Sequence, residues 1–355
     1  MRAMTRRGFG FAIGAGSLTA ACSLGVQAAF AADSSAFDPL PYVHPELRPF
    51  VGPIVAQTRG LVVTAESLPM IRKGAEQRPS PPMAAAPAWT ERMIPGPSGA
   101  PPVRIFVVNA GKSASPRPAI LHMHGGGFVF GRARDELPDV QETAAALDCV
   151  VVTVDYRLAP ETPFPGSLED NYAGLKWLYA NADELGVDRT RIAVMGDSAG
   201  GGHAAMLAIA ARDRGEVPLV FQALIYPMLD DRTASTLQKP RQQGAVGWTP
   251  AYNRFGWSSL LGVPAGSARV PKGSVPARLD DLRGLPPTFI GVGSIDLFVD
   301  EDIEYARRLI HADVAVTLDI VPGAFHGFQT FGTPIGKRFK AAIIDALRDG
   351  LAPKT

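Results

Sequence analysis

Cysteine is scarce in this sequence: its 355 residues include only Cys22 and Cys149. If the first residues are removed as an export signal, Cys22 leaves with them, and the rest of the chain can form no internal disulfide. Cys149 stands at the start of an apolar run, where a buried structural thiol is expected rather than a nucleophile. Because no second cysteine accompanies it, we expect no cysteine-based metal cluster.

A surplus of either charge is also absent. The sequence has 35 Lys and Arg residues against 34 Asp and Glu residues, which gives a formal net charge of +1 at pH 7. This balance offers no electrostatic field that would recruit nucleic acid or an acidic membrane surface. We therefore expect a small-molecule partner, and the sequence leaves a homo-oligomer open. Apolar residues make up 46% of the chain, enough to build a sizeable core.

The first 31 residues differ from the rest of the chain. Arg2, Arg6 and Arg7 precede a run of small and apolar residues that carries no further charge and ends in a small-x-small cleavage motif. The pattern resembles a twin-arginine export signal over residues 1–31, which predicts a periplasmic or secreted protein. The alternatives are an uncleaved membrane anchor and a lipoprotein attached through Cys22. After removal of the signal we expect no stable membrane span.

From residue 89 onward, short β-rich runs alternate with helical patterns. Strands are expected at residues 103–109, 119–124, 149–156, 191–196, 219–226, 287–293 and 316–321. Helices are expected at residues 168–179, 202–212, 302–310 and 337–347, the first of them beginning with a capping box of Ser167 and Asp170. Apolar strands separated by helices predict an α/β fold with a mostly parallel, doubly wound sheet covered on both faces. In such a sheet ligands bind beyond the carboxyl ends of the strands.

Two segments fall outside this alternation. Residues 38–73 look like one or two helices, and a proline-rich connector over residues 78–87 follows them. Residues 231–285 separate two strands and are too long for an ordinary connection. Their aromatic residues favour two interpretations equally: a lid over a pocket, or side chains that only fasten the insertion to the body. These aromatic residues are Trp248, Tyr252, Phe255 and Trp257.

A Gly-x-Ser-x-Gly motif over residues 196–200 lies between an expected strand and an expected helix. A turn of this kind is too tight for side chains at its glycines, and it lifts the serine hydroxyl toward a substrate. Ser198 is therefore the candidate nucleophile. A lone match is weak in a glycine-rich chain, but the flanking strand and helix strengthen it considerably.

A serine hydroxyl needs a base to take its proton and an acid to orient that base. In this architecture the order along the chain is serine, acid, histidine, so only His311 and His326 qualify. His311 ends a helical pattern, where a structural role is expected, whereas His326 lies in a loop after a strand. Asp296 follows the preceding strand and is the candidate acid. Its competitor Asp300 is better explained as the N-cap of the next helix.

Three consecutive glycines follow the strand at residues 119–124. Attack on an ester carbonyl produces an oxyanion, which needs backbone N–H donors nearby. Such donors come from the residue after the nucleophile and from a glycine-rich loop after an earlier strand. Gly125, Gly126 and Ala199 are therefore the candidate oxyanion hole, and His124 is expected to brace the loop.

Five motifs occur in an order that resembles a known family. HGGGF, DYRLAPE, GDSAGG, the GSIDLFVDE region and FHGF follow one another between about Pro118 and Phe328. Together they look like the hormone-sensitive-lipase-like family of α/β-hydrolases, the microbial carboxylesterases. The resemblance implies Ser198 as nucleophile, His326 as base, Asp296 as orienting acid, and Gly125, Gly126 and Ala199 as oxyanion donors.

The resemblance also implies a domain organisation. Residues 86–230 and 286–355 would form the catalytic α/β-hydrolase domain, and a helical cap would consist of residues 32–85 and 231–285. Arg157 and Glu161 of the DYRLAPE segment are expected to form ion pairs that hold loops near the site.

The expected activity is that of a serine carboxylesterase that cleaves short- to medium-chain esters through an acyl-enzyme, without a metal or organic cofactor. A peptidase or amidase of the same fold is one alternative, because the same three residues can cleave amides. A binding protein that keeps the fold and has lost the reaction is the other.

Overall fold

The computed structural model describes residues 37–58, 60–77, 82–113 and 115–353, of which 39–353 belong to one compact unit. The expected export signal over residues 1–31, including Cys22, lies outside the described residues. Among the described residues, no helix combines the length and the hydropathy needed to cross a membrane.

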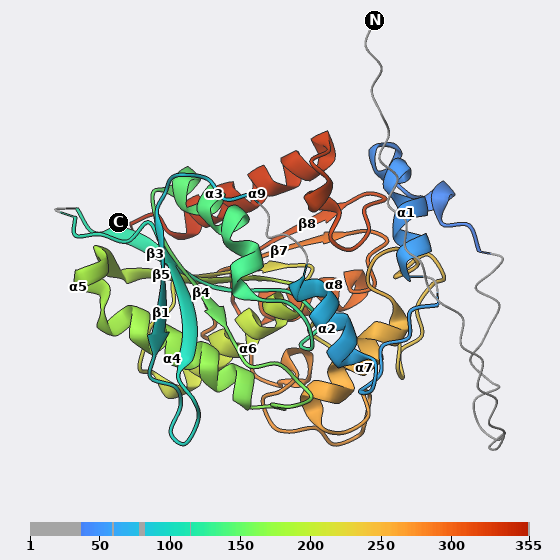
Figure 1. Cartoon of the computed structure of the whole chain (residues 1–355), viewed down its shortest axis with the longest axis horizontal. Coiled ribbons are helices and arrows are strands. Elements are labelled where there is room, and N and C mark those ends of the chain that lie inside the picture. Colours follow the sequence, from blue (N-terminus) through green and yellow to red (C-terminus); the bar gives the residue numbers. More distant parts are fainter. Residues whose placement is uncertain (1–36, 59, 78–81, 114, 354–355) are drawn as a thin grey trace, which may run out of the picture. The chain divides into compact units, whose positions relative to one another are not determined.

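An eight-stranded sheet forms the centre of this unit, with the strand order β1-β2-β4-β3-β5-β6-β7-β8 (Figure 1). The strands are β1 (Trp89–Ile94), β2 (Val103–Val108), β3 (Arg117–Met123), β4 (Val150–Asp155), β5 (Val187–Asp197), β6 (Phe221–Ile225), β7 (Thr288–Gly293) and β8 (Val316–Val321). Strand β2 pairs antiparallel with both β1 and β4, and the strands from β4 to β8 are parallel. The predicted mostly parallel α/β sheet is confirmed.

The central strands are apolar because both of their faces are buried. Along β4, Val150, Val152 and Val154 enter one core cluster, while Cys149, just before the strand, and Val151 enter the other. Successive side chains of a strand point to opposite faces, so a continuous apolar run fills two cores at once. Cys149 is fully buried and unpaired, as a structural thiol should be.

Helices cover both faces of the sheet. In Figure 1, α3 and α9 lie on one side of the sheet and α4 and α6 on the other. The helices are α1 (Arg48–Thr58), α2 (Leu68–Glu76), α3 (Leu137–Leu147), α4 (Gly166–Ala180), α5 (Ala182–Leu185), α6 (Ala199–Arg214), α7 (Pro250–Leu261), α8 (Val299–His311) and α9 (Pro334–Gly350). Short 3₁₀ helices lie at Leu40–Tyr42, Pro45–Leu47, Ala133–Glu136, Pro276–Arg278 and Phe328–Phe331.

The predicted capping box at the start of α4 is wrong. The helix begins at Gly166, so Ser167 already lies inside it, and no side-chain capping bond forms at Pro165. Asp170 is fully buried and instead accepts two hydrogen bonds from the guanidinium of Arg157, at 2.7 and 2.8 Å. A buried carboxylate gains more from a cation than from a backbone N–H that water could satisfy.

The insertion between β6 and β7 is stabilised by contacts within itself and by contacts with the rest of the protein. Asp231, at its start, is fully buried and forms a bidentate pair with Arg278, near its end, with the shorter bond at 2.7 Å. Trp257 of α7 is also fully buried and packs edge-on against Phe128 with ring centroids 4.8 Å apart. This part of the insertion fastens it to the body, as one of the two interpretations of its aromatic residues requires.

The N-terminal segment packs on the C-terminal part of the sheet. The backbone N–H of His44 donates to the carbonyl of Gly323 at 2.9 Å, in the loop that leads to His326. The carboxylate of Glu46 accepts a bond from the backbone N–H of Ile335, the second residue of helix α9, at 2.7 Å. Acceptors at helix starts satisfy N–H groups that have no partner within the helix. The segment thus braces one of the loops at the carboxyl ends of the strands.

Candidate active site

Ser198 occupies a strained turn between strand β5 and helix α6. Its backbone adopts φ +56°, a conformation that non-glycine residues rarely adopt. A Cβ at Gly196 would lie 2.3 Å from the carbonyl oxygen of Gly200, and one at Gly200 would lie 2.1 Å from that of Met123. The motif therefore needs both glycines for steric reasons, as expected for a tight strand-to-helix turn.

His326 connects Ser198 to a buried carboxylate. Its Nε2 lies 2.9 Å from the Oγ of Ser198, and its Nδ1 lies 2.8 Å from Oδ2 of Asp296. Asp296 is fully buried, and its second oxygen accepts a hydrogen bond from the backbone N–H of Phe298 at 3.0 Å. The structure thus brings together the serine, histidine and aspartate that the sequence selected.

Aromatic rings enclose the imidazole of His326. Tyr226 and Phe298 meet it edge-on, with ring centroids 4.5 and 5.2 Å away. Such packing leaves only 11% of the His326 side chain exposed and restricts the orientation of the ring, which keeps both ring nitrogens on their partners.

The competing candidates lie elsewhere. His311 is the last residue of α8, as the sequence predicts. Asp300 is not an N-cap, and that prediction is wrong: the helix begins at Val299, so Asp300 lies in its first turn. There its carboxylate pairs with Lys239 at 3.1 Å. A carboxylate in the first turn interacts favourably with the helix dipole without capping it.

Two further histidines near the site are buried and stay neutral. Burial lowers the pKa of both His122 and His203 to about 3, with the neighbouring His124 adding to the effect. His203 packs between the rings of Phe128 and Tyr156. Neither imidazole is placed to accept a proton from Ser198, whose Oγ contacts His326.

Two of the three glycines adopt conformations that side chains would disturb. Gly126 has φ +122° and Gly127 φ +58°, and a Cβ at Gly126 would lie 2.3 Å from the carbonyl oxygen of Phe130. Apart from the bonding within helices and strands, the described residues show no backbone hydrogen bond in which the N–H of Gly125 or Gly126 is the donor. Ala199, as the first residue of α6, has an N–H that no intrahelical carbonyl can accept. These three donors are therefore free for another acceptor.

His124 braces the glycine loop, as predicted. Its Nδ1 contacts the carbonyl oxygen of Gly125 at 2.8 Å, and its ring stacks on Tyr156 with centroids 4.1 Å apart. The hydroxyl of Tyr156 in turn donates to the carbonyl oxygen of His124 at 2.7 Å. Burial is the main cause that lowers the pKa of His124, so the ring remains neutral.

Both expected ion pairs of the DYRLAPE segment are present. Arg157 pairs with Asp170 of α4, and Glu161 pairs with Arg72 of α2 at 2.8 Å. The sequence analysis identified neither partner: Arg72 lies 89 positions from Glu161, and Asp170, 13 positions after Arg157, was assigned to a capping box instead.

Asp197, directly before the nucleophile, adds a titratable group to the site. Burial, followed by the charge of Asp139, raises the pKa of its carboxyl to about 7, and His326 counteracts this shift. Burial thus favours the neutral form of this carboxyl, and its electrostatic interaction with His326 links the charges of the two groups.

Trp248 brings the insertion next to these residues. A Cβ at Gly127 would lie 2.1 Å from Cη2 of Trp248, and the Trp248 ring lies 6.4 Å from that of His326. Its Nε1 donates to Oδ1 of Asn253 in α7, at 3.4 Å. The aromatic residues of the insertion therefore have two different roles. Trp257 fastens the insertion to the body of the protein, whereas Trp248 borders the site around Ser198. Among the described residues, no cluster of side chains could hold a metal ion.

A nucleophile on a strand-to-helix turn, a histidine after the last strand and a buried carboxylate that orients it define the class of serine hydrolases. A sequence profile for the alpha/beta hydrolase fold matches residues 120–330, more than half of the chain. The chain belongs to the α/β-hydrolase family, and its resemblance to the hormone-sensitive-lipase-like members is confirmed.

Relatives of this chain carry the names of ester hydrolases. It is 37% identical to esterase LipI of Mycobacterium tuberculosis over 240 residues, which cover 66% of this chain and 73% of the relative. It is 38% identical to carboxylesterase NlhH of the same species over 241 residues, 66% of this chain and 72% of the relative. The solved structure of a bacterial heroin esterase aligns with a TM-score of 0.76 and 37% identity, and covers 89% of this chain and all of its own. The chain is accordingly a carboxylic ester hydrolase.

Proposed function

We propose that this carboxylic ester hydrolase works through an acyl-enzyme on Ser198. The contact of 2.9 Å between Ser198 Oγ and His326 Nε2 carries the proposal, because it lies within the range of a direct proton transfer. As the hydroxyl attacks the ester carbonyl, its proton passes to Nε2. His326 then delivers this proton to the alkoxide oxygen as the ester bond breaks, and the alcohol leaves.

Water completes the cycle by the same route in reverse. His326 removes a proton from a water molecule that attacks the acyl-enzyme, and returns it to Ser198 as the carboxylic acid departs. Asp296 stabilises the imidazolium in both half-reactions. The N–H groups of Gly125, Gly126 and Ala199 stabilise the oxyanion, which is more negative than the carbonyl of the bound ester.

We propose short- to medium-chain esters as substrates. The experiment is hydrolysis of p-nitrophenyl esters from acetyl to palmitoyl, with Ser198→Ala beside the wild type. Activity that is highest for short acyl chains and absent in the variant supports the proposal. Equal turnover of a matched amide would favour the amidase alternative, and no turnover together with no labelling of Ser198 by a fluorophosphonate would favour a binding protein.

Trp248 is expected to limit the length of the acyl chain. Its indole lies beside Gly127 and His326, so removing the ring opens space next to the carbonyl that Ser198 attacks. Trp248→Ala should raise kcat/KM for octanoyl relative to acetyl esters by about tenfold, because the vacated space would accommodate one or two further methylenes, each contributing roughly 0.8 kcal/mol. Trp177→Ala on α4, whose indole meets the exposed Arg92, is the matched control. An unchanged ratio in Trp248→Ala would contradict this role.

Export remains a proposal that rests on the sequence of residues 1–31. The paired Arg6 and Arg7 before an uncharged run support a twin-arginine signal. The native protein, purified from the organism that makes it, should begin near Ala32, which mass spectrometry of its N-terminal peptide can establish. A peptide that still contains residues 1–31 would contradict cleavage.

A further inference from the structure

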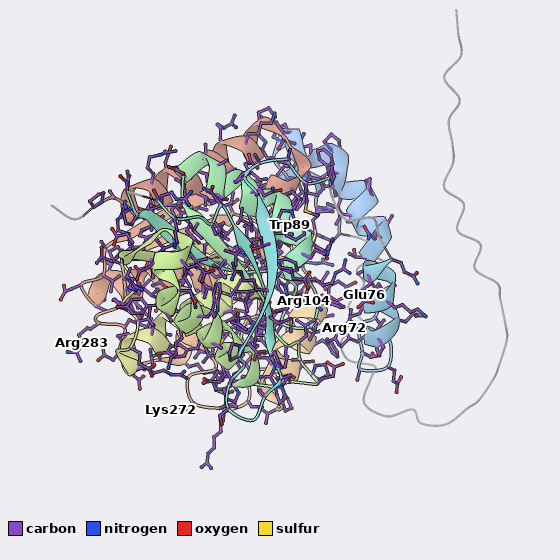
Figure 2. All side chains as sticks on the ribbon, turned by 60° about the vertical axis from the view of Figure 1, so that its left-hand side comes forward. Arg72, Glu76, Trp89, Arg104, Lys272 and Arg283 are labelled. Carbon is purple, nitrogen blue, oxygen red and sulfur yellow. The ribbon has the colours of Figure 1, made fainter. Side chains whose placement is uncertain are left out.

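Arg72 on helix α2 makes three hydrogen bonds that ester hydrolysis does not directly require. Its Nε donates to the carbonyl oxygen of Val129 at 2.8 Å, one terminal nitrogen donates to that of Ala159 at 2.7 Å, and the other pairs with Glu161 at 2.8 Å. In Figure 2, Arg72 projects from its helix toward the body of the protein. One guanidinium thus joins three points that lie 57 to 89 positions away along the chain.

Val129 belongs to the turn that shapes the glycine loop. The carbonyl of Gly126 accepts bonds from the N–H groups of Val129 at 3.1 Å and Phe130 at 2.8 Å, which closes the turn. Arg72 donates a hydrogen bond to the carbonyl of Val129, which lies in the same turn. The orientation of the peptide groups around Gly126, including the N–H proposed for the oxyanion, therefore depends on both ends of this turn.

A second connection closes a ring of hydrogen bonds around Arg72. The N–H of Ala159 donates to the carbonyl of Phe128 at 3.0 Å, while the carbonyl of Ala159 accepts from Arg72. Two adjacent carbonyls of the glycine loop are thereby held in place. The carbonyl of Phe128 is bonded to the backbone of Ala159, and the carbonyl of Val129 is bonded to the side chain of Arg72. Charge-assisted bonds from arginine are about twice as strong as neutral ones, so these contacts hold the loop firmly.

The docking of α2 does not depend on Arg72 alone. Leu68 of the same helix is 1% exposed and belongs to the core cluster that also contains Val150, Val152 and Val154 of strand β4. The segment that precedes the helix is also held, since the hydroxyl of Tyr252 donates to the carbonyl of Leu61 at 3.2 Å. Because other contacts keep the helix in place, the bonds of Arg72 to two loop carbonyls act chiefly on the loop.

We infer that Arg72 is a positioning residue that couples the docking of α2 to the geometry of the oxyanion loop. The inference rests on the proposed function, since it presumes that Gly125 and Gly126 stabilise the oxyanion. The carbonyls of Val129 and Ala159 require a planar donor with several N–H groups in a fixed arrangement, which arginine has and lysine lacks. The exposed Glu161, with 59% of its side chain accessible, contributes little to this coupling.

The test compares four variants of the full chain: Arg72→Ala, Arg72→Lys, Glu161→Gln and, as a matched control on the exposed face of α2, Lys73→Ala. With p-nitrophenyl acetate, Arg72→Ala should lower kcat about tenfold to a hundredfold and change KM less than about threefold, because loop geometry affects the transition state more than ester binding. Arg72→Lys should fall between this variant and the wild type. Glu161→Gln and Lys73→Ala should retain the wild-type kcat.

Chemical rescue distinguishes positioning from general destabilisation. Free guanidinium ion at a concentration far below denaturation should restore part of the kcat of Arg72→Ala, whereas the same ionic strength of sodium chloride should not. An unchanged kcat in Arg72→Ala would overturn the inference, as would a loss of kcat that guanidinium does not restore and that accompanies a large drop in Tm. Ser198→Ala, measured in parallel, tests the proposed function separately: activity in that variant would refute the mechanism itself, whatever Arg72 does.

Discussion

Ser198→Ala is expected to lower kcat for p-nitrophenyl esters by about four to six orders of magnitude. The hydroxyl of Ser198 makes the hydrogen bond to His326, and alanine removes it without enlarging the side chain. The residual rate then reflects binding and the oxyanion donors alone. Hydrolysis assays at saturating ester and labelling by a fluorophosphonate measure the effect, and both signals should disappear together.

Ser167→Ala is the matched control for this substitution. Ser167 is also buried, and its hydroxyl has no hydrogen-bond partner among the described residues, so its loss should leave both activity and labelling intact. If Ser198→Ala hydrolysed esters like the wild type, a different nucleophile would have to be sought and the mechanism proposed above would be wrong.

Asp296→Asn is expected to lower kcat by about four orders of magnitude while the protein stays folded. Asparagine has the same shape, but its amide can donate a hydrogen to Nδ1 of His326. The imidazole would then carry its own proton on Nε2, the nitrogen that must accept the proton of Ser198. The variant also loses the charge that stabilises the imidazolium. A pH–rate profile should show that the loss persists at all pH values at which the wild type is active.

Asp300→Asn distinguishes between the two aspartates that the sequence offers. Asp300 has 49% of its side chain exposed and pairs with Lys239, whose side chain is only 7% exposed, whereas the carboxylate that contacts His326 belongs to Asp296. The variant should keep the wild-type kcat within about twofold. A severe loss in Asp300→Asn and none in Asp296→Asn would reverse the assignment of the acid.

The sequence predicted the central strands well for a physical reason. The valines of the strand Val150–Asp155 fill cores on both sides of the sheet, and such apolar runs are recognisable without knowledge of their neighbours. Strand β1 was not predicted. It lies at the edge of the sheet, pairs with β2 alone, and exposes Thr90 and Glu91, so its sequence lacks the apolar pattern of a buried strand.

The candidate triad could also be chosen from the sequence, because each member follows a strand whose end could be located. The residues that support the site could not. Arg72 donates to backbone carbonyls. Every residue has such a carbonyl, so the amino-acid type at the acceptor position does not indicate the bond. Trp248 lies in an insertion whose path is determined by contacts such as the pair between Asp231 and Arg278. Such contacts depend on tertiary structure, which neither periodicity nor local motifs contain.

The positive φ of Ser198 has a consequence for how this enzyme can change over evolution. A non-glycine residue in such a conformation costs on the order of 1–3 kcal/mol, a sizeable part of the net stability of a typical domain. Reactivity at this position is therefore maintained at the expense of thermal resistance, and the two properties compete at a single residue. A lineage that adapts to heat must gain its stability elsewhere, and the surface loops far from the carboxyl ends of the strands are where such gains leave catalysis intact.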